Sequence, residues 1–145
     1  MTGQTPFFEE ITVGMALPEL TKTPTSTMLF RFSAVTWNAH RIHFDAAHAQ
    51  HEGHDDILVQ ATMHGAFLLQ MVKRFAGPNG QVLDFEYSNR GKAVPGDTLT
   101  LGGRVTDLDA ADATIGCEIW ERNQEGGTCA IGAARIRLPQ RGTVR

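Results

Sequence analysis

The sequence predicts an α+β fold in which one antiparallel sheet wraps around a single long helix. The first sign is the stretch from Ala61 to Ala76, which is apolar on nearly every side, as a buried helix is. The second is the change after it from helical to alternating periodicity, over four segments separated by turn residues. A lone apolar helix and a sheet with one apolar face pack most economically with the helix on that face.

The central helix has a clear C-terminal end. Lys73 and Arg74 in its last turn complement the negative end of the helix dipole. Gly77 can adopt the conformation that ends a helix, and Pro78 prevents its continuation. We therefore expect about four turns of helix.

Each of the four segments that follow the helix has one apolar face to bury. They run over Gln81 to Asn89, Asp97 to Asp107, Ala113 to Asn123, and Thr128 to Leu138. Turn residues at Asp107 to Asp112 and at Asn123 to Gly127 predict hairpins, and hence an antiparallel meander of these strands. An early strand near Ile11 to Leu17 would complete the sheet. This arrangement is the hot-dog fold.

Length and composition fit one ordinary globular domain over residues 1–145, without a linker or internal repeat. The formal net charge of -3 provides no basic field for a phosphate backbone, which argues against nucleic-acid binding. No stretch approaches the length of a membrane span, and the N-terminus lacks the features of a leader peptide, so we expect a cytoplasmic protein. Cys117 and Cys129 are expected to be small buried residues and not a disulfide.

All six histidines lie between Asn38 and His64. Three interpretations compete: a metal site, a general acid–base site and a polar surface loop. His48, His51 and His54 recur at every third residue, but no zinc-binding motif accompanies them and Gly53 interrupts the run. We expect no metal there, and we expect these three histidines in a solvated loop.

Three stretches stand out together: FSAVTWNAHRIHFD, Met63-His64-Gly65 at the start of the central helix, and AVPGDTLTLGGRV. They resemble the MaoC-like dehydratases, also called the R-specific enoyl-CoA hydratase family. Within that family, the branch with mesaconyl-CoA hydratases and fungal-type thioester dehydratases is the most similar. Their order and spacing agree over roughly residues 7 to 139.

The resemblance implies a hydro-lyase that hydrates an enoyl-CoA thioester or dehydrates a 3-hydroxyacyl-CoA, with no metal or redox cofactor. It also implies pairing, either as a homodimer or with another hot-dog subunit, which the expected free sheet edge supports. Hydration requires a base to activate water, a proton donor for the α-carbon and donors for the enolate-like oxygen, and an imidazole can accept and return a proton near neutral pH.

The motif departs from the family at its catalytic position. Asn38 stands where the family has a catalytic Asp, and an amide does not titrate at neutral pH. His40 stands where the family has Asn, and only His43 matches outright. We predict His43 as the principal base, with His40 in a catalytic or water-positioning role beside Asn38.

Other residues receive binding roles with open alternatives. The backbone N–H of Gly65 is the predicted oxyanion donor, and His64 beside it is either near the site or a packed or capping residue. Trp37 is predicted to line the acyl pocket, although a packing role is the usual one for Trp. Candidates for anionic groups of CoA or of the substrate are Arg41, Arg90 and Lys92, each of which is otherwise a solvated charge. Asp45 either orients an imidazole or caps a helix.

Two alternatives to a hydratase stay open. The Asn at position 38 is compatible with a non-catalytic subunit of a heteromeric hydratase. A thioesterase of the same fold would need a carboxylate on or near the central helix. Between Gly65 and the last turn, that helix offers only Gln70 as a polar residue.

Overall fold

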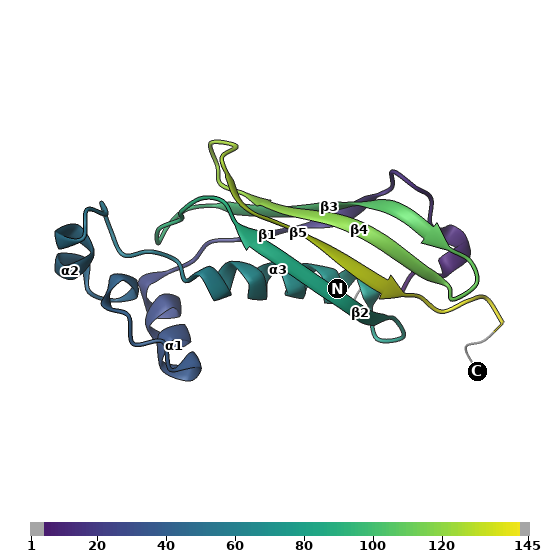
Figure 1. The fold of residues 1–145 in the computed structure, drawn as a ribbon, viewed down its shortest axis with the longest axis horizontal. Coiled ribbons are helices and arrows are strands. Elements are labelled where there is room, and N and C mark those ends of the chain that lie inside the picture. The colour runs from purple at the N-terminus through teal and green to yellow at the C-terminus, as the bar shows by residue number, and fades with distance from the viewer. Residues whose placement is uncertain (1–4, 143–145) are drawn as a thin grey trace.

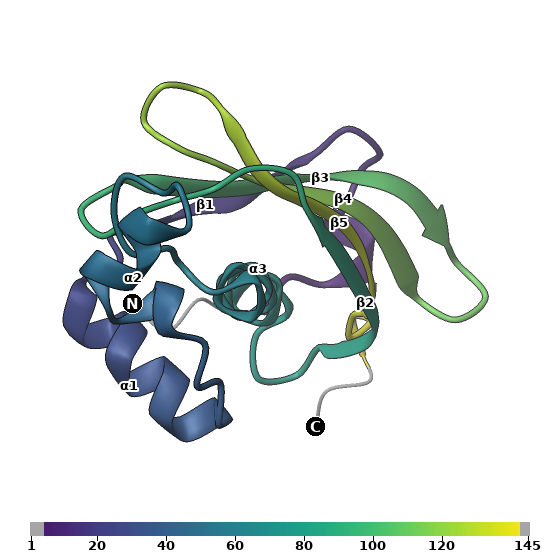
Figure 2. The ribbon, with the colours of Figure 1, turned by 60° about the vertical axis from the view of Figure 1, so that its left-hand side comes forward.

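The computed structural model describes residues 5–142, so the N-terminal stretch in which we expected no leader begins outside the described part. Within it, one antiparallel sheet curves around a long helix, which is the predicted hot-dog arrangement (Figures 1 and 2). The strands are β1 (Ala16–Lys22), β2 (Gln81–Asn89), β3 (Leu99–Asp109), β4 (Thr114–Arg122) and β5 (Thr128–Arg137). The helices are α1 (Ser26–Thr36), α2 (Ala46–His51) and α3 (Ala61–Ala76), with short 3-10 helices η1 (Phe8–Glu10) and η2 (Arg41–His43).

Helix α3 has the predicted bounds and lies in the concave face of the sheet, seen nearly end-on in Figure 2. Its first turn is closed by the Gln60 carbonyl, which accepts the N–H of His64 at 3.3 Å. Its end is the predicted one, because Gly77 has a φ of 65° and donates its N–H to the Lys73 carbonyl at 3.0 Å. Burial of each large apolar side chain of this helix contributes about 1.5–3 kcal/mol. The buried ones are Met63, Phe67, Leu68, Met71, Val72 and Phe75.

The sheet order is β1-β3-β4-β5-β2, which corrects part of the predicted topology. Strands β3, β4 and β5 form the expected meander through the two predicted hairpins. Strand β2, however, pairs with β5 and not with its chain neighbour β3. Strand β2 lies beside the end of α3, which precedes it in the chain. The loop from β2 to β3 therefore has to cross the sheet. Strand β2 is an edge of the sheet, with its outer side unpaired in the described chain.

The first strand lies later than predicted. We expected it near Ile11 to Leu17, whereas β1 spans Ala16–Lys22 and pairs antiparallel with β3. A register shift between Leu17 and Leu20 lets both side chains reach the core, so the alternation on which a sequence prediction relies is broken there. Ile11 is buried, but it precedes the strand.

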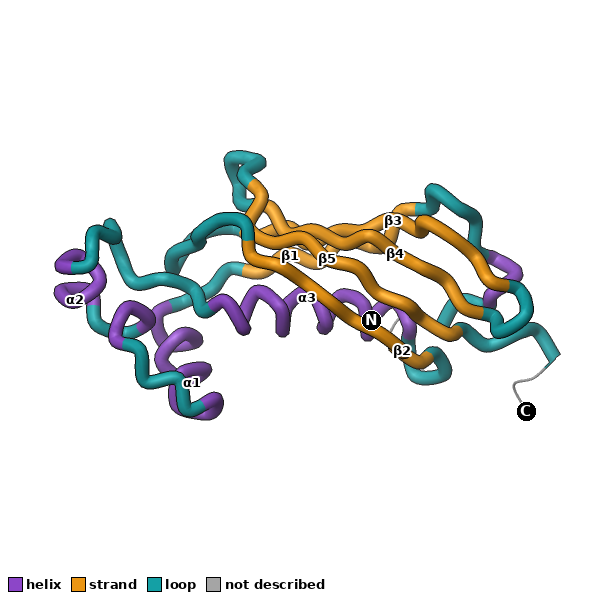
Figure 3. Tube along the Cα trace, viewed as in Figure 1, coloured by secondary structure: helices purple, strands orange, loops and turns teal. Residues whose placement is uncertain are grey.

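Between β1 and α3, a solvated loop was expected only around His48, His51 and His54, and the structure folds much of this segment as helix. In Figures 1 and 3, α1 and α2 project beyond the N-terminal end of α3, away from the sheet. Helix α1 is capped at its start by Thr25, whose hydroxyl accepts the N–H of Met28 at 3.2 Å, and at its end by Trp37 in a left-handed conformation with φ 56°. We call residues 25–60 the overhang. It carries five of the six histidines.

The remaining expectations for the core agree with the structure. Cys117 and Cys129 are free and buried, and burial raises the pKa of their thiols to about 12 and about 11. The apolar face predicted for the segment from Asp97 to Asp107 is also confirmed, because Leu99, Leu101 and Val105 are all buried. In the described residues, no helix is long and apolar enough to cross a membrane.

Candidate active site

His43 is the most confined histidine of the overhang, with 8% of its surface exposed. Its Nδ1 lies 2.8 Å from the carbonyl oxygen of Leu58, and because a carbonyl only accepts, Nδ1 carries the proton. This contact fixes the tautomer and leaves Nε2 as the free basic nitrogen. Desolvation by burial, opposed by the bond to Leu58 and aided by His40, lowers the pKa of His43. The imidazole is therefore neutral at physiological pH, the form that a general base requires.

Three histidine rings lie in a row on the overhang. The His40 ring centroid is 6.0 Å from that of His43 and 6.5 Å from that of His48. His40 is exposed, and its backbone N–H reaches the Oδ1 of Asn38 at 3.3 Å. Asn38 thus uses its side-chain oxygen to shape the turn before η2. The structure places the motif residues Asn38, His40 and His43 next to one another.

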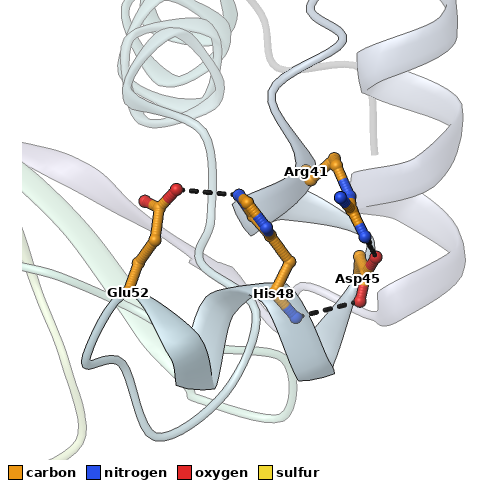
Figure 4. Close-up of polar contacts among 4 residues, drawn as sticks. All are labelled: Arg41, Asp45, His48 and Glu52. Carbon is orange, nitrogen blue, oxygen red and sulfur yellow. Dashed lines mark hydrogen bonds and ion pairs between the residues drawn. The ribbon is translucent and has the colours of Figure 1, made fainter.

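Asp45 caps a helix and does not orient an imidazole ring. Its Oδ1 accepts the N–H of His48 at 3.0 Å at the start of α2, and its Oδ2 lies 2.6 Å from the guanidinium of Arg41 (Figure 4). The Arg41 hydrogen bond, followed by the His48 N–H, lowers the pKa of Asp45. Of the two readings of Asp45, the cap is therefore the observed one. Arg41 is exposed, and its guanidinium forms an ion pair with Asp45.

The predicted solvated loop of histidines is wrong in part. His48 and His51 belong to α2, because Asp45 supplies the cap that starts a helix there. The ring of His48 lies 2.7 Å from the carboxylate of Glu52, one turn later (Figure 4). Only His54 follows the helix, and its Nδ1 is 3.1 Å from the Nζ of Lys92.

An apolar hollow of about 350 Å³ lies next to the histidine row. Trp37 is among the residues that line it, but 94% of its surface is exposed. Asn38 of the motif also lines this hollow. The other lining residues are Phe30, Ser33, Ala34, Ala39 and Phe44.

Gln60 ties the overhang to the start of α3 and was not identified from sequence. Its side chain is fully buried, and its Nε2 donates to the Leu29 carbonyl at 2.7 Å and to the Ser33 hydroxyl at 2.9 Å, both on α1. Leu58, whose carbonyl oxygen bonds to the Nδ1 of His43, lies two positions before Gln60. The candidate base and the beginning of α3 are thus held by one short segment.

Gly65 is buried in α3 directly under the phenol of Tyr87, which comes from the edge strand β2. A Cβ at this position would fall on the ring and would lie 2.7 Å from its hydroxyl oxygen. Gly65 is the fifth residue of the helix, beyond the four residues whose N–H groups lack partners in a helix by geometry. The close approach explains why no side chain is present here.

His64 is buried as one of the two predicted alternatives requires, and its partner is a residue that the sequence analysis missed. Its Nδ1 bonds to the Oε1 of Glu121 on β4, and the two side chains are 2% and 0% exposed. A signal for Glu121 was present in the sequence. It continues the inward alternation of Ile115, Cys117 and Ile119, so the period itself places an acidic residue on the core face.

The remaining candidates lie beyond the end of β2. Arg90 is exposed, with its backbone N–H bonded to the Cys129 carbonyl at 2.8 Å. The contact of Lys92 with His54 places it beside α2, and the nearby Val59 N–H reaches the Ala93 carbonyl at 2.9 Å. Both cations are therefore at the end of the sheet from which the overhang projects. Among the described residues, no group of three or more His, Cys, Asp or Glu side chains could hold a metal ion.

Comparison with known proteins supplies the family. The model of hydroxyacyl-thioester dehydratase type 2 matches residues 15–94, more than half of the chain and the whole of the overhang. The chain belongs to that family. It is also 43% identical over 54 residues to the mesaconyl-C(4)-CoA hydratase of Chloroflexus aurantiacus, a match that covers 37% of this chain and 19% of that protein. The predicted relationship to the MaoC-like dehydratases, in the branch with mesaconyl-CoA hydratases, is thereby confirmed.

Solved structures agree on the fold. An R-hydratase of Pseudomonas aeruginosa superposes with a TM-score of 0.85 at 22% identity, over 92% of this chain and 85% of that one. A chain from the ChsH1–ChsH2 complex of Mycobacterium tuberculosis gives a TM-score of 0.79 at 24% identity, over 88% and 98% of the two chains. At such identities the likeness establishes a shared hot-dog fold.

Proposed function

We propose that this chain catalyses the reversible addition of water to the double bond of an enoyl-CoA, or the loss of water from the 3-hydroxyacyl-CoA. The observation that carries the proposal is His43, a confined and neutral imidazole with one nitrogen anchored and the other free. Membership of a hydroxyacyl-thioester dehydratase family supports the reaction class. The match to a mesaconyl-C(4)-CoA hydratase supports a CoA thioester as substrate.

In the proposed reaction, the Nε2 of His43 accepts a proton from water as the water oxygen bonds to the β-carbon. The electron pair of the double bond moves toward the thioester oxygen, and the same proton is returned to the α-carbon as the carbonyl re-forms. His40 positions the water from the neighbouring turn, and Asn38 holds that turn through its hydrogen bond to His40. The reaction is redox-neutral and needs no metal or redox cofactor.

The negative charge that develops on the thioester oxygen requires a donor, and we assign the Gly65 N–H to this role. The amide lies near the positive end of the α3 dipole, which favours negative charge. Because Gly65 is the fifth residue of α3, the thioester oxygen must share this N–H with the helix, or the first turn must open slightly on binding. Tyr87 covers Gly65 in the free protein and must also shift to admit the substrate.

The remaining candidates bind the rest of the substrate in this proposal. Trp37 forms one wall of the acyl subsite. Arg90 and Lys92, at the end of the sheet beside the overhang, meet anionic groups of CoA, and Arg41 meets a substrate carboxylate if it leaves Asp45. His64 acts as the neighbour of Gly65 and has no direct contact with the substrate.

We further propose that the chain is a single domain that pairs with a second hot-dog subunit. The free edge of β2 supports this, because an unpaired strand of this length invites pairing with another strand. The partner is either a second copy or a different chain, as the name of the ChsH1–ChsH2 complex indicates for that relative.

A second candidate function is that of a non-catalytic subunit in a heteromeric hydratase. The amide at Asn38 favours it, because it stands where the resemblance to the MaoC-like dehydratases implies a catalytic acid and it does not titrate. In this case the chain would need an active hot-dog partner before any turnover appeared.

Purified protein with crotonyl-CoA and a set of branched and dicarboxylic enoyl-CoAs tests the proposal, through the loss of absorbance of the conjugated thioester. We expect turnover that His43→Ala reduces by at least about a hundredfold, within the range of general acid–base contributions. His51→Ala is the matched control, since His51 is an exposed histidine of α2. Absence of turnover by the folded wild type with every substrate would contradict the proposal and favour the non-catalytic subunit.

A further inference from the structure

The described residues contain one carboxylate with no exposed surface, that of Glu121 on β4, and it bonds to a histidine that is itself buried. Burying a carboxylate costs several kcal/mol in desolvation, and a buried ion pair is often less stabilising than apolar side chains of the same volume. The remaining oxygen of this carboxylate, Oε2, has no hydrogen-bond partner among the described residues. Stability alone is therefore a poor reason for a buried His–Glu pair at this place.

The pair sits one residue from the candidate oxyanion donor. His64 lies in the first turn of α3, and the peptide group between it and Gly65 carries the N–H to which we assign that role. The backbone N–H of His64 is already used by the Gln60 carbonyl at 3.3 Å. Its ring is held by Glu121 from the centre of the sheet, so rotation of this turn would break the contact between Nδ1 and Oε1.

Gly65 is also fixed from a second direction. The phenol of Tyr87, on β2, packs against it so closely that no side chain fits. Strand β4 acts through His64, and β2 acts directly, so the two strands define the position of the same peptide. Because Tyr87 must shift when the substrate enters, the contact of His64 with Glu121 is the one left to hold this peptide in the complex. A donor held in place before the reaction is what makes electrostatic stabilisation of an oxyanion effective.

We propose that Glu121 is a positioning residue of the acyl-thioester site, acting through His64 to hold the Gly65 N–H in place. This inference rests on the proposed function. Glu121 touches no substrate, because it is enclosed by the sheet and α3. Its effect is exerted on the transition state, where the oxyanion forms, more than on binding of the substrate.

Three variants separate positioning from stability. Glu121→Gln keeps an oxygen that can accept from Nδ1–H, and we expect it to retain kcat within about threefold of the wild type, a small change in free energy. Glu121→Leu combined with His64→Leu removes the pair without leaving either partner buried alone. We expect this double variant to be at least as resistant to urea as the wild type. Its kcat should nevertheless fall about ten- to a hundredfold, with KM changed less.

The matched control is Glu118→Leu, three residues earlier on β4, where the carboxylate lies on the outer face and pairs with Arg104. It should leave both kcat and KM near the wild-type values. A folded Glu121/His64 double-leucine variant with unchanged kcat would overturn the inference while leaving the proposed function intact. A wild type without turnover on any enoyl thioester would overturn the proposed function and the inference with it.

Discussion

Substitution of Gly65 by alanine tests the packing on which the site depends. Alanine is favoured over glycine inside a helix by about 1 kcal/mol, so an open position would become more stable. At Gly65, however, the new methyl group would fall on the Tyr87 phenol, 2.7 Å from its oxygen. Overpacking of this kind costs about 1–3 kcal/mol, since β2 or the ring must move. We expect a net loss of unfolding free energy of up to about 2 kcal/mol.

A double-mutant cycle in urea isolates the cause. In a Tyr87→Ala background the clash is absent, so Gly65→Ala should become neutral or should stabilise by up to about 1 kcal/mol. The coupling energy between the two positions is then about 1–3 kcal/mol. The same cost of Gly65→Ala in both backgrounds would refute the reasoning, because the loss would then arise within the helix and not from the contact with β2.

Three further predictions concern the overhang and the core. Because the pKa of His43 is lowered in the folded state, the unfolded state binds more protons below about pH 6.5. Stability should fall as the pH drops through that value, and less so in His43→Asn, as urea unfolding at several pH values would reveal. The buried thiols of Cys117 and Cys129, with pKa values raised to about 12 and about 11, should resist a thiol reagent at about pH 8 until urea unfolds the chain. Gln60→Leu should lower the unfolding free energy by about 1–3 kcal/mol, since two acceptors lose their buried donor; unchanged urea resistance would contradict this.

Much of the fold was predictable because its signals are local. The helix Ala61–Ala76 is marked by an apolar surface and by Gly77, and its bounds agree with the prediction. The strand Gln81–Asn89 was also placed correctly, but its partner was not. Which strand β2 pairs with depends on the position of the chain at the end of the preceding helix. Hydrophobic periodicity contains no information about that position.

The overhang was harder to predict for a different reason. Helix α1 has few apolar residues facing the core, and α2 exists because Asp45 supplies a cap. Both helices are short, and isolated helices of this length are marginal without tertiary contacts. The bond from Gln60 to α1 is such a contact, and it joins residues 31 positions apart.

For the candidate site, the motif named candidate residues but not the atoms through which they interact. In the structure, Asn38, His40 and His43 are neighbours. The carbonyl of Leu58, which sets the tautomer of His43, has no sequence signature because every residue carries one. Glu121 was detectable as an acid on an apolar strand face, yet its contact with His64 joins residues 57 positions apart.

Product analysis in water labelled with ¹⁸O tests the central claim most directly. A hydratase that uses His43 as its base converts enoyl-CoA into hydroxyacyl-CoA that contains one labelled oxygen, with the thioester intact. We expect this product from the wild type, and only a trace of it from His43→Ala. Labelled free acid together with released CoA would contradict the account and identify a thioesterase, and an unchanged yield in His43→Ala would remove His43 from the mechanism.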